Sequence, residues 1–306
     1  MHNPVMAEKV VELLAPRKGG VYVDGTVGAG GHVKVLLGRL DGDGMVICID
    51  RDRNALSCAK SVLEPWSDQI KLLYGNFADM KALIKTLGIG KVNGIVLDLG
   101  MSSMQVNQAE RGFSFMKDGP LDMRMDTSRK TSAADLVDRL SEPELARIIC
   151  QFGEEPAGRR IARAIVIERH QKGEWTTRRL AQMVERVMHR RGKIHPATKT
   201  FQALRIAVND ELKNLENGLE IGISLLAAKG RMVVISYHSL EDRLVKQSFK
   251  KHIGRWESLP EGGRPWEGIK PVVRTIFKKP LTPSAEEILL NSRARSAKMR
   301  CIERVD

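Results

Sequence analysis

The chain reads Val21-Tyr22-Val23-Asp24-Gly25-Thr26-Val27-Gly28-Ala29-Gly30-Gly31-His32 near its start, an apolar run that gives way to closely spaced glycines. This order is typical of a strand that passes into a nucleotide-binding loop, because glycines let the backbone turn sharply and approach a ligand closely. A helix beginning near His32 would present its free N–H groups to the same ligand. A plain tight turn would show the same glycines, so the interpretation depends on the rest of the chain.

Strand-like and helix-like runs alternate around this loop. Apolar runs predict strands at residues 20–24, 45–50, 70–74 and 94–99, with helices between them, and further strands at 231–236, 272–278 and 298–304. The first four runs are continuously apolar, as expected for strands covered on both faces. We therefore expect an α/β fold with a parallel sheet that closes with an antiparallel pair of strands.

Between these two groups of strands the chain shows helical periodicity only. Helices are predicted at 132–139, 142–152, 158–171, 177–190 and 200–215, and the stretch 101–125 is expected to be a long functional loop. The economical interpretation is one discontinuous domain, formed by residues 1–105 and 200–306. A helical insertion would occupy residues 106–199.

Charge is concentrated in that insertion. The whole protein of 306 residues carries a formal net charge of +13, and the segment 157–200 alone holds twelve Lys and Arg residues against three acidic ones. Basic side chains that neutralise phosphates release bound counterions, so this segment predicts a nucleic-acid partner. A solvated basic face without a partner is the alternative.

The remaining composition excludes several classes of protein. No apolar run is long enough to span a bilayer, and the N-terminus lacks the pattern of a signal peptide, so we expect a soluble, cytoplasmic protein. The four cysteines show no C-x-x-C spacing, which argues against a zinc ribbon or a disulfide framework. We expect them to be reduced and mostly buried.

Polar residues stand where the predicted strands end. Asp50 ends the second strand, where a carboxylate can bind ribose hydroxyls; Asn76 and Phe77 follow the third; Asp98 ends the fourth. Phe77 can stack on an adenine or be an ordinary core ring. A dinucleotide and S-adenosylmethionine both fit these features, but a dinucleotide oxidoreductase would need a second mononucleotide-binding half.

Five motifs in order resemble the RsmH (MraW) family of bacterial methyltransferases, which act on N4 of a cytidine in small-subunit (16S) ribosomal RNA. The motifs are residues 24–32, 98–105, 112–125, 195–198 and 236–243. The resemblance covers essentially the whole chain. It implies a class I (Rossmann-like) methyltransferase fold with an inserted helical, RNA-recognising domain, and S-adenosyl-L-methionine as the cofactor.

The resemblance also implies which residues bind the cofactor: Gly30, Gly31, His32, Asp50, Phe77, Asp98 and Gln105. The residue before Val27 departs from the common methyltransferase loop, in which a glycine takes the place of Thr26. Many amino-methyltransferases carry prolines and an aromatic after the fourth strand. This chain has Leu99-Gly100-Met101-Ser102 there, so that mechanism does not transfer directly.

For the chemistry, we expect Asp98 and Ser102 to shape the methyl-transfer site and His238 to reach the same crevice, with no metal ligand assigned. A structural histidine that caps the following helix is the alternative for His238. The expected partner is 16S ribosomal RNA within the small ribosomal subunit, with no membrane partner and with a homodimer left open. Methylation of another nucleic acid, a non-catalytic RNA-binding assembly factor and a nicotinamide oxidoreductase are the competing functions.

Overall fold

The computed structural model describes residues 4–171, 173–188, 195–254 and 270–305. Contacts between Cα atoms divide the chain into two compact units. We call Met1–Gly100 with Leu212–Asp306 the sheet unit, and Met101–Glu211 the helical unit. Each is described by itself.

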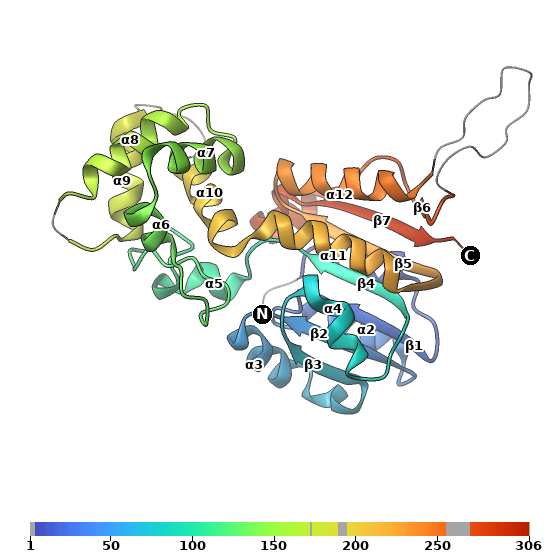
Figure 1. The fold of residues 1–306 in the computed structure, drawn as a ribbon. Coiled ribbons are helices and arrows are strands. Elements are labelled where there is room, and N and C mark those ends of the chain that lie inside the picture. Colours follow the sequence, from blue (N-terminus) through green and yellow to red (C-terminus); the bar gives the residue numbers. More distant parts are fainter. Residues whose placement is uncertain (1–3, 172, 189–194, 255–269, 306) are drawn as a thin grey trace, which may run out of the picture. The chain divides into compact units, whose positions relative to one another are not determined.

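The sheet unit holds a seven-stranded sheet in the order β3-β2-β1-β4-β5-β7-β6 (Figure 1). Its strands are β1 Gly20–Asp24, β2 Gly44–Asp50, β3 Ile70–Tyr74, β4 Val92–Asp98, β5 Leu226–Ser236, β6 Val273–Thr275 and β7 Lys298–Arg304. Strands β1 to β5 are parallel, and β7 runs antiparallel to both β5 and β6. The expected α/β fold with a closing antiparallel pair is confirmed. Because the chain leaves β1 toward β2 on one side and returns to β4 on the other, a ligand crevice is expected where β1 and β4 end.

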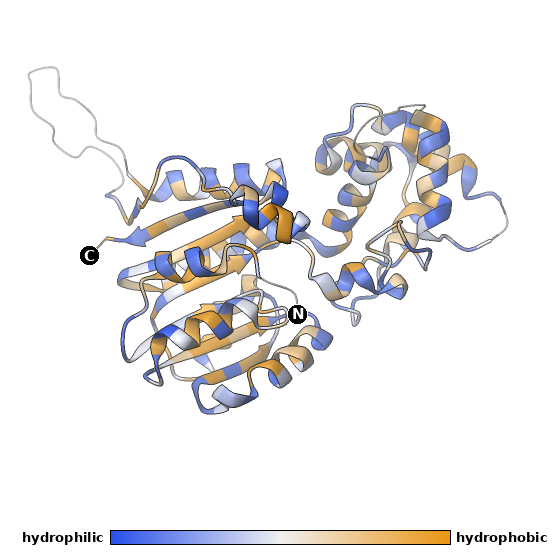
Figure 2. Ribbon diagram, turned by 180° about the vertical axis from the view of Figure 1, so that it is seen from behind, coloured by the Kyte–Doolittle hydropathy of each residue, from blue (hydrophilic) through white to orange (hydrophobic). Residues whose placement is uncertain are grey.

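Helices cover both faces of this sheet. They are α1 Ala7–Leu14, α2 Gly31–Leu40, α3 Arg53–Val62, α4 Met80–Lys85, α11 Glu211–Leu225, α12 Ser239–His252 and α13 Ala285–Leu290, with short 3₁₀ turns at Glu64–Gln69, Phe77–Asp79 and Ser292–Ser296. Alternate strand residues enter two separate cores: Val46 packs with α1, α2 and α3, whereas Ile47 packs with α4, α11 and α12. In Figure 2 the strands of this sheet are coloured mostly as hydrophobic. The continuous apolar runs thus reflect burial on both faces.

The helical unit has a core of its own. Its elements are α5 Ser103–Asn107, a 3₁₀ turn at Ala109–Arg111, α6 Ala133–Arg139, α7 Glu142–Gly153, α8 Gly158–Glu168, α9 Thr177–Met188 and α10 Thr198–Asn209. Helix α7 begins as expected at Ser141, whose N–H donates to Glu144 Oε2 at 2.9 Å in a capping box. A methyl group at Gly153 would lie 2.6 Å from the Lys199 carbonyl, so this glycine lets α7 and α10 approach closely.

One helix predicted from the sequence is wrong. The run 200–215 is two helices, because Asp210 adopts a left-handed conformation with φ of 50° between α10 and α11. Aspartate tolerates this region better than most residues. Leu204 of α10 packs in the core of the helical unit and Leu215 of α11 in that of the sheet unit. Contacts therefore divide the chain at 101 and 211, whereas the sequence suggested 106 and 199.

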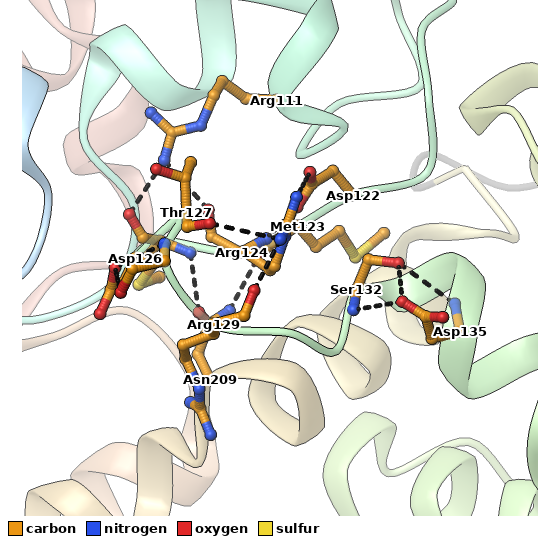
Figure 3. A network of polar contacts seen from close by, with 12 residues as sticks. Arg111, Asp122, Met123, Arg124, Asp126, Thr127, Arg129, Ser132, Asp135 and Asn209 are labelled. Carbon is orange, nitrogen blue, oxygen red and sulfur yellow. Dashed lines mark hydrogen bonds and ion pairs between the residues drawn. The ribbon is translucent and has the colours of Figure 1, made fainter.

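The loop between the 3₁₀ turn and α6 is irregular but held by polar contacts (Figure 3). Arg124 makes a two-pronged contact with Asp122, at 2.8 and 2.6 Å, and Arg111 donates to the carbonyls of Arg124 and Met125 at 3.0 Å. Buried Asn209 donates to the Met123 carbonyl at 2.7 Å and accepts the Met125 N–H at 2.8 Å. Backbone groups that a strand would satisfy are here satisfied by side chains.

Candidate active site

The glycine loop joins β1 to α2 at the expected place. Gly28 and Gly30 have φ of 52° and 83°, and Gly30 is the N-cap of α2. A side chain at Gly25 would lie 2.5 Å from Leu97 Cδ2, so the loop can cross the end of β4 only with glycine there. The free N–H groups of the first turn of α2 thus begin at Gly31, as required for an anion- or nucleotide-binding loop.

Asp50 ties this loop to the end of β2. Its Oδ2 accepts the Gly28 N–H at 2.9 Å and its Oδ1 accepts the Asp52 N–H at 2.9 Å. Burial raises the pKa of Asp50, and these two donors oppose the rise. The carboxylate therefore fixes the loop, and its oxygens retain lone pairs for a further donor such as a ribose hydroxyl.

The hydrogen bonds of Thr26 explain why a threonine stands where the common loop has a glycine. Its Oγ1 accepts the Asp98 N–H at 2.7 Å, and its own N–H donates to Asp24 Oδ1 at 3.0 Å. The threonine thus bridges the ends of β1 and β4. A glycine at this position would leave the Asp98 N–H without that acceptor.

Tyr237 completes the surroundings of Asp98, and sequence reasoning missed it as a site residue. Its hydroxyl donates to Asp98 Oδ1 at 2.7 Å. Burial and the adjacent Asp98 carboxylate raise the pKa of Tyr237, so the hydroxyl stays a donor throughout the physiological pH range. Tyr237 directly follows β5, and the strand-end rule that selected Asp98 would have selected it too.

Asp24 is the most deeply buried acid here, with 2% of its surface exposed. Burial raises the pKa of Asp24 to about 6, a rise that His32 opposes. His32 is itself buried; its Nε2 lies 2.9 Å from the Val5 carbonyl and its Nδ1 lies 3.9 Å from Asp98 Oδ2. The carboxyl groups of Asp98 and Asp50 both add to the raised pKa of Asp24, so this end of the sheet favours a cation.

The segment before α1 lies against the glycine loop. A methyl group at Gly31 would lie 3.0 Å from the Pro4 ring, and the Val5 carbonyl faces His32 as described above. The Met6 N–H donates to Glu287 Oε1 of α13 at 2.6 Å. The loop is thus supported from outside by residues at both ends of the sequence.

Phe77 lies in the core that α4 and α11 share. It is 7% exposed, and a methyl group at Gly218 of α11 would lie 2.4 Å from its ring. The core-ring alternative therefore describes its packing. Contact of Phe77 with an adenine stays a prediction.

His238 is the N-cap of α12, as the structural alternative expected. Its Nδ1 accepts the Glu241 N–H at 3.4 Å, and its Nε2 lies 3.2 Å from Glu241 Oε1. Glu241 is buried and also accepts the Tyr237 N–H at 2.8 Å. His238 therefore has a structural task at the end of β5, and its catalytic task stays a prediction.

Ser102 and Gln105 belong to the helical unit. They form the capping box of α5: the Gln105 N–H donates to Ser102 Oγ at 3.2 Å, and the Ser102 N–H donates to Gln105 Oε1 at 3.1 Å. Gln105 is buried. Their contact with cofactor or substrate stays a prediction.

The basic segment of the helical unit separates into two groups. Arg169 donates to the Val137 and Leu140 carbonyls, at 2.5 and 2.8 Å, and Arg179 donates to the Gly173 and Glu168 carbonyls, at 2.6 and 2.8 Å, with its guanidinium over the Trp175 ring. The exposed group consists of Arg159, Arg160, Arg163, Arg178 and Arg186. Lys199 donates to the Glu154 carbonyl at 2.8 Å, and Lys172, Arg190, Arg191 and Lys193 lie outside the described residues.

The cysteines correct one smaller expectation. All four cysteines are free, but only Cys48 and Cys301 are buried, so "mostly buried" was too strong. Among the described residues, none of the helices has the length and apolar character needed to cross a membrane.

Comparison with known proteins gives a consistent result. Residues 1–305 match the model of the MraW methylase family. A protein of Parvibaculum lavamentivorans called "Ribosomal RNA small subunit methyltransferase H" is 48% identical over 305 residues, covering 99% of this chain and 89% of the relative. Relatives of the same name from Syntrophotalea carbinolica and Geotalea uraniireducens are 48% and 45% identical, each covering 99% of this chain and 98% of the relative.

Proposed function

The chain belongs to the MraW methylase family, and on that premise we propose that it transfers a methyl group from S-adenosylmethionine to the N4 amine of a cytidine in 16S ribosomal RNA. Membership in this family makes the protein an S-adenosylmethionine-dependent methyltransferase. The observation that supports the proposal most is the gathering of Asp24, Asp50 and Asp98 beside a glycine loop at the strand-order reversal.

The residues at this crevice fit the cofactor. When bound, S-adenosylmethionine supplies an electrophilic methyl group on a positively charged sulfur. Negatively charged groups suit that charge, and Gly28 and Gly30, where a positive φ favours glycine, let a ligand approach the backbone closely. We assign cofactor binding to the positions named by the family resemblance: Gly30, Gly31, His32, Asp50, Phe77, Asp98 and Gln105.

The reaction needs alignment and charge compensation. Cytosine N4 is a weak nucleophile because its lone pair is delocalised into the ring. We propose that the Asp98 carboxylate accepts a hydrogen bond from this amine, which favours a pyramidal nitrogen and balances the positive charge that develops on it. Ser102 and His238 are the other two proposed catalytic residues, although both also cap helices.

The RNA is assigned to the helical unit. We propose that the exposed Arg159, Arg160, Arg163, Arg178 and Arg186 contact phosphates around the target nucleotide. The target base must be unpaired or leave its stack to reach a buried methyl group.

The decisive experiment is methyl transfer from labelled S-adenosylmethionine to small subunits, naked 16S RNA, transfer RNA and DNA, followed by nucleoside analysis. The proposal predicts N4-methylcytidine at one position of the 16S RNA. Label in another nucleic acid would favour a different substrate. Cofactor binding without transfer to any of the four would favour a non-catalytic assembly factor.

Single-turnover assays would then test the residue roles. Asp98→Ala is expected to reduce the rate by about a hundredfold or more, as when a group that stabilises developing charge is lost. Ser102→Ala and His238→Ala should be measured beside it, each with a melting curve because both remove a cap. A wild-type rate in Asp98→Ala would remove Asp98 from the mechanism.

A further inference from the structure

Two motifs that the methyl-transfer site does not use meet inside the helical unit. Phe115, from the loop before α6, and His195, just before α10, stack with ring centroids 4.4 Å apart and planes tilted by 31°. Phe201 of α10 meets Phe115 edge-on, with centroids 4.9 Å apart. The three rings form a row that begins at buried Phe201 and ends at His195.

The His195 ring is held rigidly. Its Nδ1 accepts the Ala197 N–H at 3.2 Å, and its Nε2 lies 2.8 Å from Glu185 Oε1 of α9. An Nδ1 that accepts leaves Nε2 as the donor to Glu185, so both nitrogens are engaged. Phe115 covers one face of the ring.

The side chain of His195 is nevertheless 33% exposed. Because both nitrogens are engaged and Phe115 covers one face, we assign this exposed surface to the opposite face of the ring. A flat, immobilised ring with one open face is the arrangement on which unpaired RNA bases stack. The exposed arginines of the same unit would supply the phosphate contacts.

We propose that His195, backed by Phe115 and Phe201, is a stacking platform for one unpaired base of the RNA substrate. The inference rests on the proposed function, because it assumes that the helical unit binds RNA. It assigns His195 a binding task and no part in the methyl transfer.

The test measures binding of a short single-stranded RNA that carries one 2-aminopurine, whose fluorescence falls when the base stacks. His195→Leu removes the flat ring and is expected to weaken binding by about tenfold and to abolish part of the quenching. His195→Phe keeps a flat ring without the nitrogens and is expected to retain most of both. His170→Leu, an exposed histidine of the same unit, is the matched control and should bind as the wild type does.

Three results would overturn the proposal: unchanged binding and quenching in His195→Leu, equal losses in the Leu and Phe variants, or an equal loss in His170→Leu. Equal losses in His195→Leu and His195→Phe would show that the contact of His195 with Glu185 matters, and not stacking. Affinity for S-adenosylmethionine should stay unchanged in all variants. Because the probe is read without methyl transfer, failure of the platform is distinct from failure of the proposed reaction, which the nucleoside analysis reports.

Discussion

The sheet unit and the helical unit use charged residues in opposite ways. In the sheet unit, Asp24, Asp50 and Asp98 lie far apart in sequence but meet because parallel strands bring their carboxyl ends to one edge. In the helical unit, two residues adjacent in sequence have different surroundings. Arg178 is exposed, whereas Arg179 donates to backbone carbonyls and lies over the Trp175 ring. The end of a strand therefore predicts where acidic side chains gather, whereas a count of basic residues does not predict which of them are exposed.

A large effect on stability is expected to separate Arg178 from Arg179. Arg179→Gln removes charged donors from half-buried carbonyls, so we expect a loss of about 2 kcal/mol in the free energy of unfolding and a lower melting temperature. Arg178→Gln, the adjacent control, should leave the melting temperature unchanged. Equal melting temperatures in the two variants would show that the two groups of arginines do not differ.

The exposed arginines and Arg179 should also differ in their effect on RNA binding. Replacing Arg159, Arg163 and Arg178 together with Gln should weaken binding of single-stranded RNA and reduce the slope of log affinity against log salt by about 2, since each phosphate contact contributes about 0.7. The slope of Arg179→Gln should match that of the wild type. Affinity titrations at several salt concentrations measure it, and an unaltered slope in the triple variant would remove these residues from the RNA surface.

The third prediction uses Asp24, the acid that the sheet unit buries most deeply. The pKa of Asp24 is raised to about 6 by burial, so its contribution to stability is present below the pKa of the unfolded chain and is lost as the pH rises through 6. Asp24→Asn keeps an acceptor for Thr26 and cannot ionise. At pH 8 we expect it to be more stable by about 1–3 kcal/mol, and at pH 4 to gain nothing.

Raising the pH should have the opposite effect on cofactor affinity from its effect on stability. Wild-type affinity for S-adenosylmethionine should fall as the pH drops through 6, because protonation of Asp24 removes negative charge from the crevice. S-adenosylhomocysteine, which lacks the sulfonium charge, should show a weaker dependence, and Asp24→Asn should show little. Calorimetric titrations at pH 5 and pH 8 distinguish these cases; identical pH profiles for both ligands would contradict the role of Asp24.

The smallest expected effect concerns Tyr237. Tyr237→Phe removes the donor to Asp98 and should lower methyl transfer by about tenfold, the value of one hydrogen bond to a charged group. Because a lost donor raises the pKa of a carboxylate, the acid limb of the rate profile should move to higher pH. His32, Asp24, Glu241 and Glu287 are other titratable groups near this pair.

Tyr22→Phe is the matched control. The Tyr22 hydroxyl accepts the Arg17 N–H at 2.7 Å, so this variant also loses one hydrogen bond of a buried tyrosine in the sheet unit. It should change stability and leave the rate profile in place. If both variants behave alike, Tyr237 supports the fold only.

The sequence predicts most elements of both units, but β5 begins at Leu226 and not at Arg231, and β6 is limited to Val273–Thr275. The bounds of β1, β3 and β7 match the predicted strands, because burial on both faces leaves an uninterrupted apolar run that only turns can end. The break at Asp210 was missed, since apolar residues keep the helical spacing on both sides of it although they face different cores. The spacing of apolar residues along a helix shows that one of its faces is buried. It does not show which other elements cover that face.

The site shows the same limit. Asp50 and Asp98 follow from the strand-end rule, but their partners do not. The Gly28 N–H and the Thr26 hydroxyl are brought to them by the course of the loop, which the residue types do not predict. His238 was ambiguous because a histidine beside Glu241 can serve either catalysis or a cap, and only the placement of its nitrogens shows the cap.

The contacts of Pro4, Val5 and Met6 form at different times as the chain is synthesised. These residues are made first, yet the Met6 N–H finds its acceptor only when Glu287 has been translated. Since domains acquire their contacts as the chain emerges, Pro4 can meet Gly31 and Val5 can meet His32 early, whereas the hydrogen bond of Met6 to α13 is among the last to form. The segment that supports the glycine loop from outside is therefore fixed at its far end only when the chain is nearly complete.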